Sequence, residues 1–138
     1  MGRARILVAD DHASMLERVS MLLATDYDVV AAVSDGVAAV ESALSLHPDL
    51  LVLDISMPRM TGLEAATRLA DEPHPAPVVF LTVHDDQEFI EAARAVGALG
   101  YVLKRNIATE LLPVIGRALA GQATFLATLI AHSTLANS

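Results

Sequence analysis

Short runs of consecutive apolar residues recur along the chain, and polar residues close each of them. Four of the runs are unbroken and too short for a buried helix, a pattern typical of parallel strands covered on both faces. A fifth run is diluted by alanine and indicates a weaker strand. In chain order the predicted strands are residues 6–9, 29–33, 50–53, 78–81 and 101–103.

Between these runs, apolar residues recur three and four positions apart, which predicts amphipathic helices. Ser14 is expected to start the first helix and Gly97 to end the fourth, while Asp85 and Asp86 are expected to cap the start of the fourth. Pro113 is placed near the first turn of the last helix, where a missing N–H costs least. The predicted helices cover about residues 15–23, 37–44, 62–70, 86–96 and 109–119.

A strand–helix unit repeated five times predicts a doubly wound, flavodoxin-like α/β fold, with a five-stranded parallel sheet and five helices joined by right-handed crossovers. A chain of 138 residues holds one such domain and no second of ordinary size. We expect this domain over residues 1–121 and a tail or start of a linker over residues 122–138, with no output domain in this chain. In the tail, the spacing of Leu126, Leu129 and Ile130 suggests one or two further helical turns.

Composition narrows the range of functions. Hydrophobic residues make up 54% of the chain and charged residues 19%, so disorder is not expected. The net charge of -8 repels phosphate backbones and anionic lipids, which predicts no nucleic-acid contacts from this chain and no membrane binding. No apolar run approaches the roughly 18 residues of a membrane helix, so we expect a soluble, cytoplasmic protein. The absence of cysteine excludes disulfides and thiolate chemistry.

Candidate chemistry lies where the predicted strands end, because ligands of such sheets bind at the carboxyl edge. The first strand is followed by Asp10 and Asp11, the third by Asp54, the fourth by Thr82, and the fifth by Lys104, the only lysine in the chain. Three clustered carboxylates need a cation, and an all-oxygen ligand set suits Mg2+. The set predicts in-line phosphoryl transfer to a carboxylate, with Asp54 as the nucleophile because it lies at the centre of the sheet.

These residues, together with the loop Ser56-Met57-Pro58 after Asp54 and Gly100-Tyr101 before Lys104, resemble the receiver domain of bacterial two-component response regulators (CheY-like), most closely the NarL/FixJ group. The resemblance covers roughly residues 6–120. It implies a phosphoacceptor signalling domain that catalyses only its own phosphorylation and dephosphorylation. It also implies a histidine kinase as phosphodonor, a homodimer formed on phosphorylation, and control of a partner or of a DNA-binding output domain absent from this chain.

The resemblance also assigns roles to individual residues. Asp54 would accept the phosphoryl group, and Asp11, Asp54 and the backbone carbonyl of Ser56 would hold Mg2+ while Asp10 supports its waters. The phosphoryl oxygens would contact Lys104 and Thr82. Two switch residues, Thr82 and Tyr101, would then reshape the surface formed by the fourth helix, fifth strand and fifth helix.

Other readings remain open at this stage. A phosphatase of the haloacid dehalogenase type also uses a strand-end aspartate, a threonine and a lysine, but it needs an acid where this chain has Ser56. A receiver-like scaffold that is never phosphorylated is the second alternative. The five histidines are interpreted as solvated, except that His84, two positions after Thr82, is expected to influence water access to the phosphoryl group. Gly62 is interpreted as a loop residue with positive φ.

Overall fold

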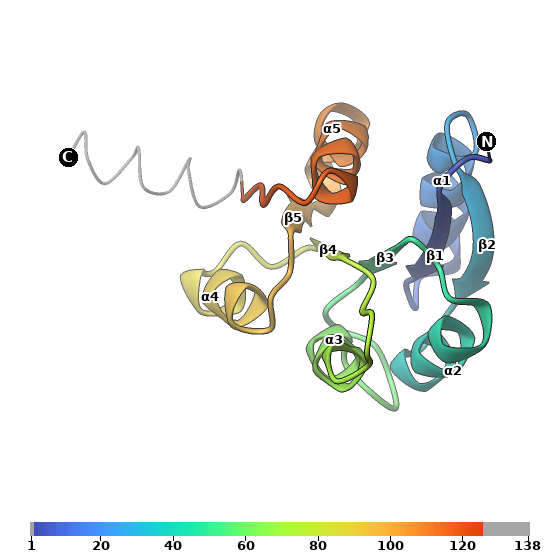
Figure 1. Ribbon diagram of the computed structural model, residues 1–138. Coiled ribbons are helices and arrows are strands. Elements are labelled where there is room, and N and C mark those ends of the chain that lie inside the picture. The colour runs from blue at the N-terminus through green and yellow to red at the C-terminus, as the bar shows by residue number, and fades with distance from the viewer. Residues whose placement is uncertain (1, 126–138) are drawn as a thin grey trace.

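The computed structural model describes residues 2–125, which form a parallel sheet of five strands with helices on both faces (Figure 1). The strand order is β2-β1-β3-β4-β5, so β3 lies in the middle. This arrangement confirms the predicted fold class. The elements are β1 (Arg5–Ala9), α1 (Ala13–Leu23), β2 (Asp28–Val33), α2 (Gly36–Leu46), β3 (Leu50–Leu53), α3 (Gly62–Ala70), β4 (Val78–Thr82), α4 (Gln87–Ala95), β5 (Gly100–Leu103), the short 3-10 helix η1 (Lys104–Asn106) and α5 (Ile107–Leu119).

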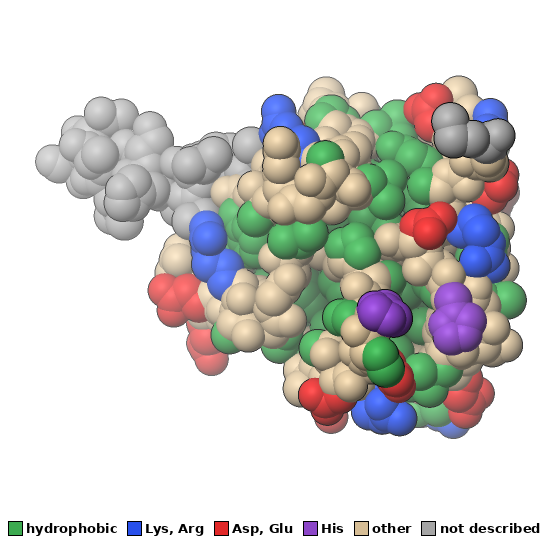
Figure 2. Space-filling view, in the orientation of Figure 1, with side chains coloured by type: hydrophobic (Ala, Val, Ile, Leu, Met, Phe, Trp, Pro, Cys, Tyr) green, Lys and Arg blue, Asp and Glu red, His purple; other side chains and the backbone are tan. Residues whose placement is uncertain are grey.

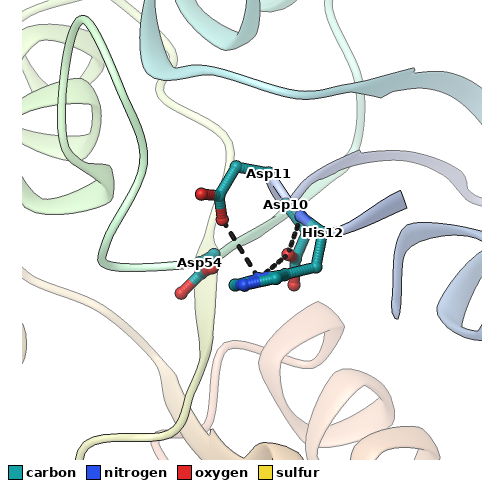
Figure 3. A group of neighbouring side chains, drawn as sticks. All are labelled: Asp10, Asp11, His12 and Asp54. Carbon is teal, nitrogen blue, oxygen red and sulfur yellow. Dashed lines mark hydrogen bonds and ion pairs between the residues drawn. The ribbon is translucent and has the colours of Figure 1, made fainter. Parts of the chain in front are cut away.

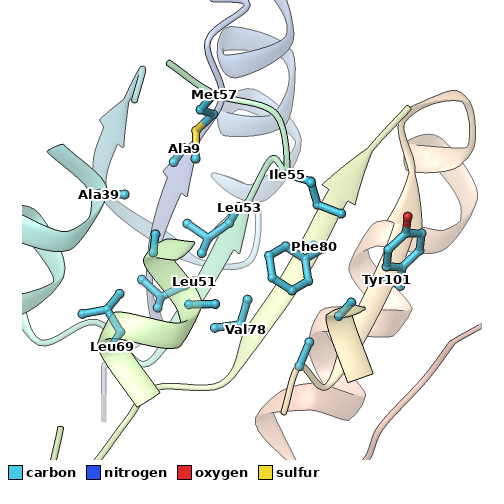
Figure 4. Close-up of a cluster of buried hydrophobic side chains, with 14 of the residues drawn as sticks. Ala9, Ala39, Leu51, Leu53, Ile55, Met57, Leu69, Val78, Phe80 and Tyr101 are labelled. Carbon is cyan, nitrogen blue, oxygen red and sulfur yellow. The ribbon is translucent and has the colours of Figure 1, made fainter. Parts of the chain in front are cut away.

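Successive side chains of each strand point to opposite faces of the sheet, which divides the core into two layers. Leu7 and Phe80 point to the face covered by α2, α3 and α4, whereas Ile6 and Val79 point to the face covered by α1 and α5. Figure 4 shows part of the first layer, with Phe80 between Leu53 and Tyr101. Because both faces are covered, the central strands carry apolar residues at every position, which explains the unbroken runs in the sequence. The edge strand β2 is only partly buried, in keeping with its weaker pattern.

Two predicted helix starts were wrong. The first helix begins at Ala13, and His12, with extended backbone, occupies the N-cap position that was assigned to Ser14. The last helix begins at Ile107, so Pro113 lies in its interior rather than near its first turn. The helix tolerates this proline because Pro113 and Thr109 are both exposed, so water can reach the Thr109 carbonyl that lacks its helical partner.

The two ends of α4 lie where the sequence predicts them. Gly97 has φ of 85°, and its N–H donates to the Arg94 carbonyl while the Ala98 N–H donates to the Ala93 carbonyl. These two bonds close the helix as a Schellman motif, which confirms the predicted stop. At the other end Asp86 is the N-cap residue, but its side chain makes no capping hydrogen bond.

The chain beyond α5 returns to the sheet. Thr124 forms a parallel bridge with Gly100, and Phe125 is buried. The apolar positions Leu126, Leu129 and Ile130 lie outside the described residues. No helix within residues 2–125 is long and apolar enough to cross a membrane. Figure 2 shows acidic and basic side chains scattered over the visible face rather than gathered by sign.

Candidate functional site

The carboxyl ends of four strands meet at one edge of the sheet. Ala9 pairs with Leu53 and Thr82 with Leu103, so the residues at and just beyond these positions are brought together from distant parts of the chain. The Asp54 N–H donates to the Ala9 carbonyl at 2.9 Å, which fixes Asp54 beside the end of β1. Figure 3 shows Asp54 facing Asp10, Asp11 and His12.

Lys104 joins two of the carboxylates beneath this surface. Its Nζ lies 2.8 Å from Asp10 Oδ2 and 3.0 Å from Asp54 Oδ2. The relative exposure of Lys104 is 8%, that of Asp10 1% and that of Asp54 3%, so all three charges are buried. The only lysine of the chain is therefore the counter-ion of the cluster rather than a solvated strand end.

The site opposes ionisation of Asp54. Burial, with the neighbouring Asp10 carboxylate, raises the pKa of Asp54 above its ordinary value, although Lys104 and the Ser56 N–H favour the charged form. Burial lowers the pKa of Lys104, but Asp10 and Asp54 together raise it above its ordinary value. Asp10, Asp11 and Asp54 together outnumber the single positive charge of Lys104, and a further cation would offset the remaining negative charge.

His12 is exposed, as predicted, yet its ring lies against the acidic cluster. Its Nδ1 lies 3.3 Å from Asp10 Oδ1 and 3.2 Å from Asp11 Oδ1. Possible ligand atoms of these three residues and Asp54 all lie within 4.8 Å of one another. His12 has no histidine four residues away, so the signal for this contact is its position directly after two strand-end acids.

The cluster has the chemistry of a site for a hard divalent cation. Asp10, Asp11 and Asp54 supply carboxylate oxygens, the ligands that Mg2+ prefers. Asp10 Oδ2 is paired with the Lys104 ammonium at 2.8 Å, whereas Asp10 Oδ1 faces His12. The residues present therefore fit a divalent metal ion.

Three hydrogen bonds converge on His84, next to the cluster. Its backbone N–H donates to Thr82 Oγ1 at 3.1 Å, its carbonyl accepts from the Tyr101 hydroxyl at 2.6 Å, and its Nε2 lies 2.9 Å from Ser56 Oγ. Thr82 and Tyr101 are buried, with relative exposures of 0% and 1%. His84 therefore connects the two predicted switch residues through its backbone, a role that side-chain patterns do not reveal.

Gly62 is required at the site for a reason other than the one predicted. Its φ is not positive; in this loop Arg59 adopts the left-handed backbone instead, with φ of 70°. A Cβ on Gly62 would collide with the backbone carbonyl oxygen of Asp54, so glycine permits the close approach of α3 to the end of β3. Thr61 then starts α3 with a reciprocal capping box.

The fold and this cluster define a doubly wound α/β domain with a cluster of acids and one lysine at its carboxyl edge. Residues 6–115 match the response regulator receiver domain, and the chain belongs to that family. The match confirms the resemblance found in the sequence. It does not favour the phosphatase or the scaffold alternative.

Individual relatives agree with this assignment. The chain is 37% identical over 112 residues to the transcriptional regulatory protein PdtaR of Mycobacterium tuberculosis, covering 80% of this chain and 54% of the relative. It is 38% identical over 114 residues to the oxygen regulatory protein NreC of Staphylococcus aureus, covering 80% of this chain and 52% of the relative. The chain thus spans about half the length of the curated relatives it matches.

Solved structures show the same domain. The signal receiver domain of the response regulator NarL from Mycobacterium tuberculosis superposes with a TM-score of 0.84 at 30% identity, covering 88% of this chain and all of that one. A two-component response regulator of the LuxR family from Aurantimonas sp. SI85-9A1 gives a TM-score of 0.86 at 31% identity, covering 95% of this chain and 94% of that one.

Proposed function

We propose that this domain accepts a phosphoryl group on Asp54 from a histidine kinase and converts it into a change of surface. The observation that supports the proposal is the buried lysine bridging Asp10 and Asp54 at the carboxyl edge of the sheet. Such a lysine keeps a fixed positive charge where phosphoryl oxygens arrive.

In the proposed reaction a carboxylate oxygen of Asp54 attacks phosphorus and forms a new P–O bond. The P–N bond of the donor phosphohistidine breaks, and the leaving imidazole nitrogen keeps the bonding electron pair. Lys104, 3.0 Å from Asp54 Oδ2, would pair with a phosphoryl oxygen, and the buried Thr82 hydroxyl would donate to another. In-line transfer of this kind needs positioning and charge stabilisation more than covalent catalysis.

The metal in this proposal is Mg2+, held by Asp11, Asp54 and the backbone carbonyl of Ser56, with Asp10 orienting its waters. When bound, it would offset the repulsion among the carboxylates and the incoming phosphoryl oxygens. The carboxylate oxygens of the cluster, whose ligand atoms lie within 4.8 Å of one another, support this assignment.

The proposed output uses Thr82 and Tyr101 as switch residues. Their connection through the backbone of His84 supports this role. PdtaR, the relative at 37% identity, is a transcriptional regulatory protein, which supports an output in transcription. For the present chain, control of a partner or a DNA-binding output domain and homodimer formation on phosphorylation are parts of the proposal.

The test is incubation of the full chain with acetyl phosphate or phosphoramidate and Mg2+. We expect one phosphate per chain, stable in acid, labile to hydroxylamine and dependent on Mg2+. Asp54→Asn should abolish labelling, whereas Asp71→Asn, which changes an exposed acid at the end of α3, should leave it unchanged. Labelling of Asp54→Asn to the wild-type extent, or none in the wild type, contradicts the proposal.

A further inference from the structure

We infer that His12 is a further ligand of the metal site, and that its imidazole gives the site an affinity for divalent transition cations, such as Ni2+ or Zn2+, that the carboxylates alone do not supply. The inference rests on the proposed function, because it concerns the cation bound at the same site. It adds a nitrogen ligand to a set that the strand-end acids describe by oxygen ligands alone.

The backbone at the start of α1 brings the His12 side chain to the acidic cluster. His12 directly follows Asp10 and Asp11, and its own N–H donates to Asp10 Oδ1 at 2.8 Å. As the N-cap residue of α1 it has extended backbone, and its side chain makes no capping hydrogen bond. The ring is therefore not used to start the helix, and Figure 3 shows it beside the two acids, reaching toward Asp54.

The separations between the donor atoms suit a single ion. His12 Nδ1 lies 3.3 Å from Asp10 Oδ1 and 3.2 Å from Asp11 Oδ1. Around a cation with bonds of about 2.0–2.1 Å, neighbouring ligand atoms are about 2.9 Å apart in an octahedron and about 3.3 Å apart in a tetrahedron. An oxygen of Asp54 lies within 4.8 Å of the same atoms, so the four side chains surround one position.

The imidazole completes the cluster on its solvent side. The side chain of His12 is 68% exposed and that of Asp11 32%, so an ion can enter from water while Asp10 and Lys104 stay buried beneath it. Mg2+ prefers oxygen ligands and gives up its waters reluctantly, whereas imidazole nitrogen suits Ni2+ and Zn2+. His12 should therefore contribute to the binding of a transition cation and little to the binding of Mg2+.

The experiment is isothermal titration calorimetry of the full, untagged chain with Ni2+ and, separately, with Mg2+. We expect His12→Ala to weaken Ni2+ binding at least about tenfold, since loss of even an outer-shell partner costs about 10–100-fold in metal affinity. Mg2+ binding should change less than about twofold. The control His74→Ala, at an exposed position of the loop before β4, should bind both cations like the wild type. Unchanged Ni2+ binding in His12→Ala, or an equal loss of affinity for both cations, overturns the inference.

X-ray absorption at the nickel edge identifies the ligand directly. We expect scattering from the ring carbons of one imidazole in the wild type and none in His12→Ala. A wild type without this signal overturns the inference, and so does a signal that persists in His12→Ala, which would assign Ni2+ to another histidine such as His84. The proposed function is decided separately by Mg2+-dependent labelling of the wild type with acetyl phosphate, so labelling at Asp54 without an imidazole ligand removes this inference alone.

Discussion

Asp54→Asn should make the metal-free protein more stable, although Asp54 is paired with Lys104. Asparagine has nearly the same shape, and its one amide oxygen can take the place of Asp54 Oδ2, 3.0 Å from Lys104 Nζ, with loss of the long 3.3 Å bond from the Ser56 N–H to Asp54 Oδ1. Lys104 keeps its second partner, Asp10. The substitution therefore removes one buried negative charge while leaving the lysine paired.

The magnitude follows from three opposing effects. At an effective dielectric constant of about 20, the attraction between Asp54 and Lys104 at 3.0 Å is about 5.5 kcal/mol. Repulsion between Asp54 and Asp10, whose ligand atoms lie within 4.8 Å, is at least about 3.5 kcal/mol. Burial of the Asp54 charge costs several kcal/mol more, and Asp11 adds a smaller, solvent-screened repulsion. We expect a net gain of about 1–3 kcal/mol, or about 4–12 °C in Tm.

The pH dependence has a defined sign. Because burial raises the pKa of Asp54 above 3.8, the folded metal-free protein holds a proton there more readily than the unfolded chain does. The destabilising charge is fully present above the raised pKa and is lost as the pH falls toward 3.8. The stability difference between Asp54→Asn and the wild type should therefore be largest at neutral pH and shrink on acidification.

Urea and thermal unfolding with EDTA, and with Mg2+ at increasing concentration, provide the assay. Mg2+ should stabilise the wild type by mass action and the variant less, so the gap closes as Mg2+ is added. Glu41→Gln changes the net charge equally at an exposed site on α2 and is the control. A metal-free Asp54→Asn protein no more stable than both wild type and Glu41→Gln would refute the reasoning.

Two further predictions concern the loop that follows Asp54. Gly62→Ala places a Cβ against the Asp54 carbonyl and should lower the free energy of unfolding by about 2–4 kcal/mol. The control Gly116→Ala, in open space on α5, should raise it by up to about 1 kcal/mol. Equal effects of the two substitutions in urea unfolding would contradict the close approach of Gly62 to Asp54. Thr61→Ala removes the capping box of α3 and should lower the free energy of unfolding by about 1 kcal/mol. The exposed control Thr67→Ala should lower it by less. A difference near zero between the two variants would show that the cap does not contribute to stability.

The sequence was sufficient for the architecture because this architecture constrains the pattern strongly. A central parallel strand buried on both faces has no polar positions, so the run 50–53 can be recognised without its partners. The site followed from the same geometry. Asp54 and Lys104 are 50 residues apart, yet both directly follow a buried strand, and parallel strands bring such positions to one edge.

The remaining features depend on contacts that no local pattern specifies. The need for Gly62 comes from the backbone of Asp54, and the tolerance of Pro113 comes from solvent on one side of α5. Phe125 was assigned to a tail because the helical pattern ends before it. Its partners Tyr101 and Arg94 lie on β5 and α4, and only the return of the chain to the sheet edge makes that one aromatic residue part of the core.

The charge arrangement indicates why a stability cost persists at the carboxyl edge. A core selected for stability alone would replace the buried Lys104, Asp10 and Asp54 by apolar residues, since such replacements are often neutral or stabilising. With the three charges retained, the metal-free domain holds carboxylates that one lysine does not fully offset. A bound metal ion would offset the excess negative charge of the carboxylates, and a phosphoryl group on Asp54 would add negative charge again. Both would therefore change the free energy of the same cluster. In the proposed function, the residues expected to weaken the metal-free fold are thus the same ones that would make its stability sensitive to metal and phosphoryl binding.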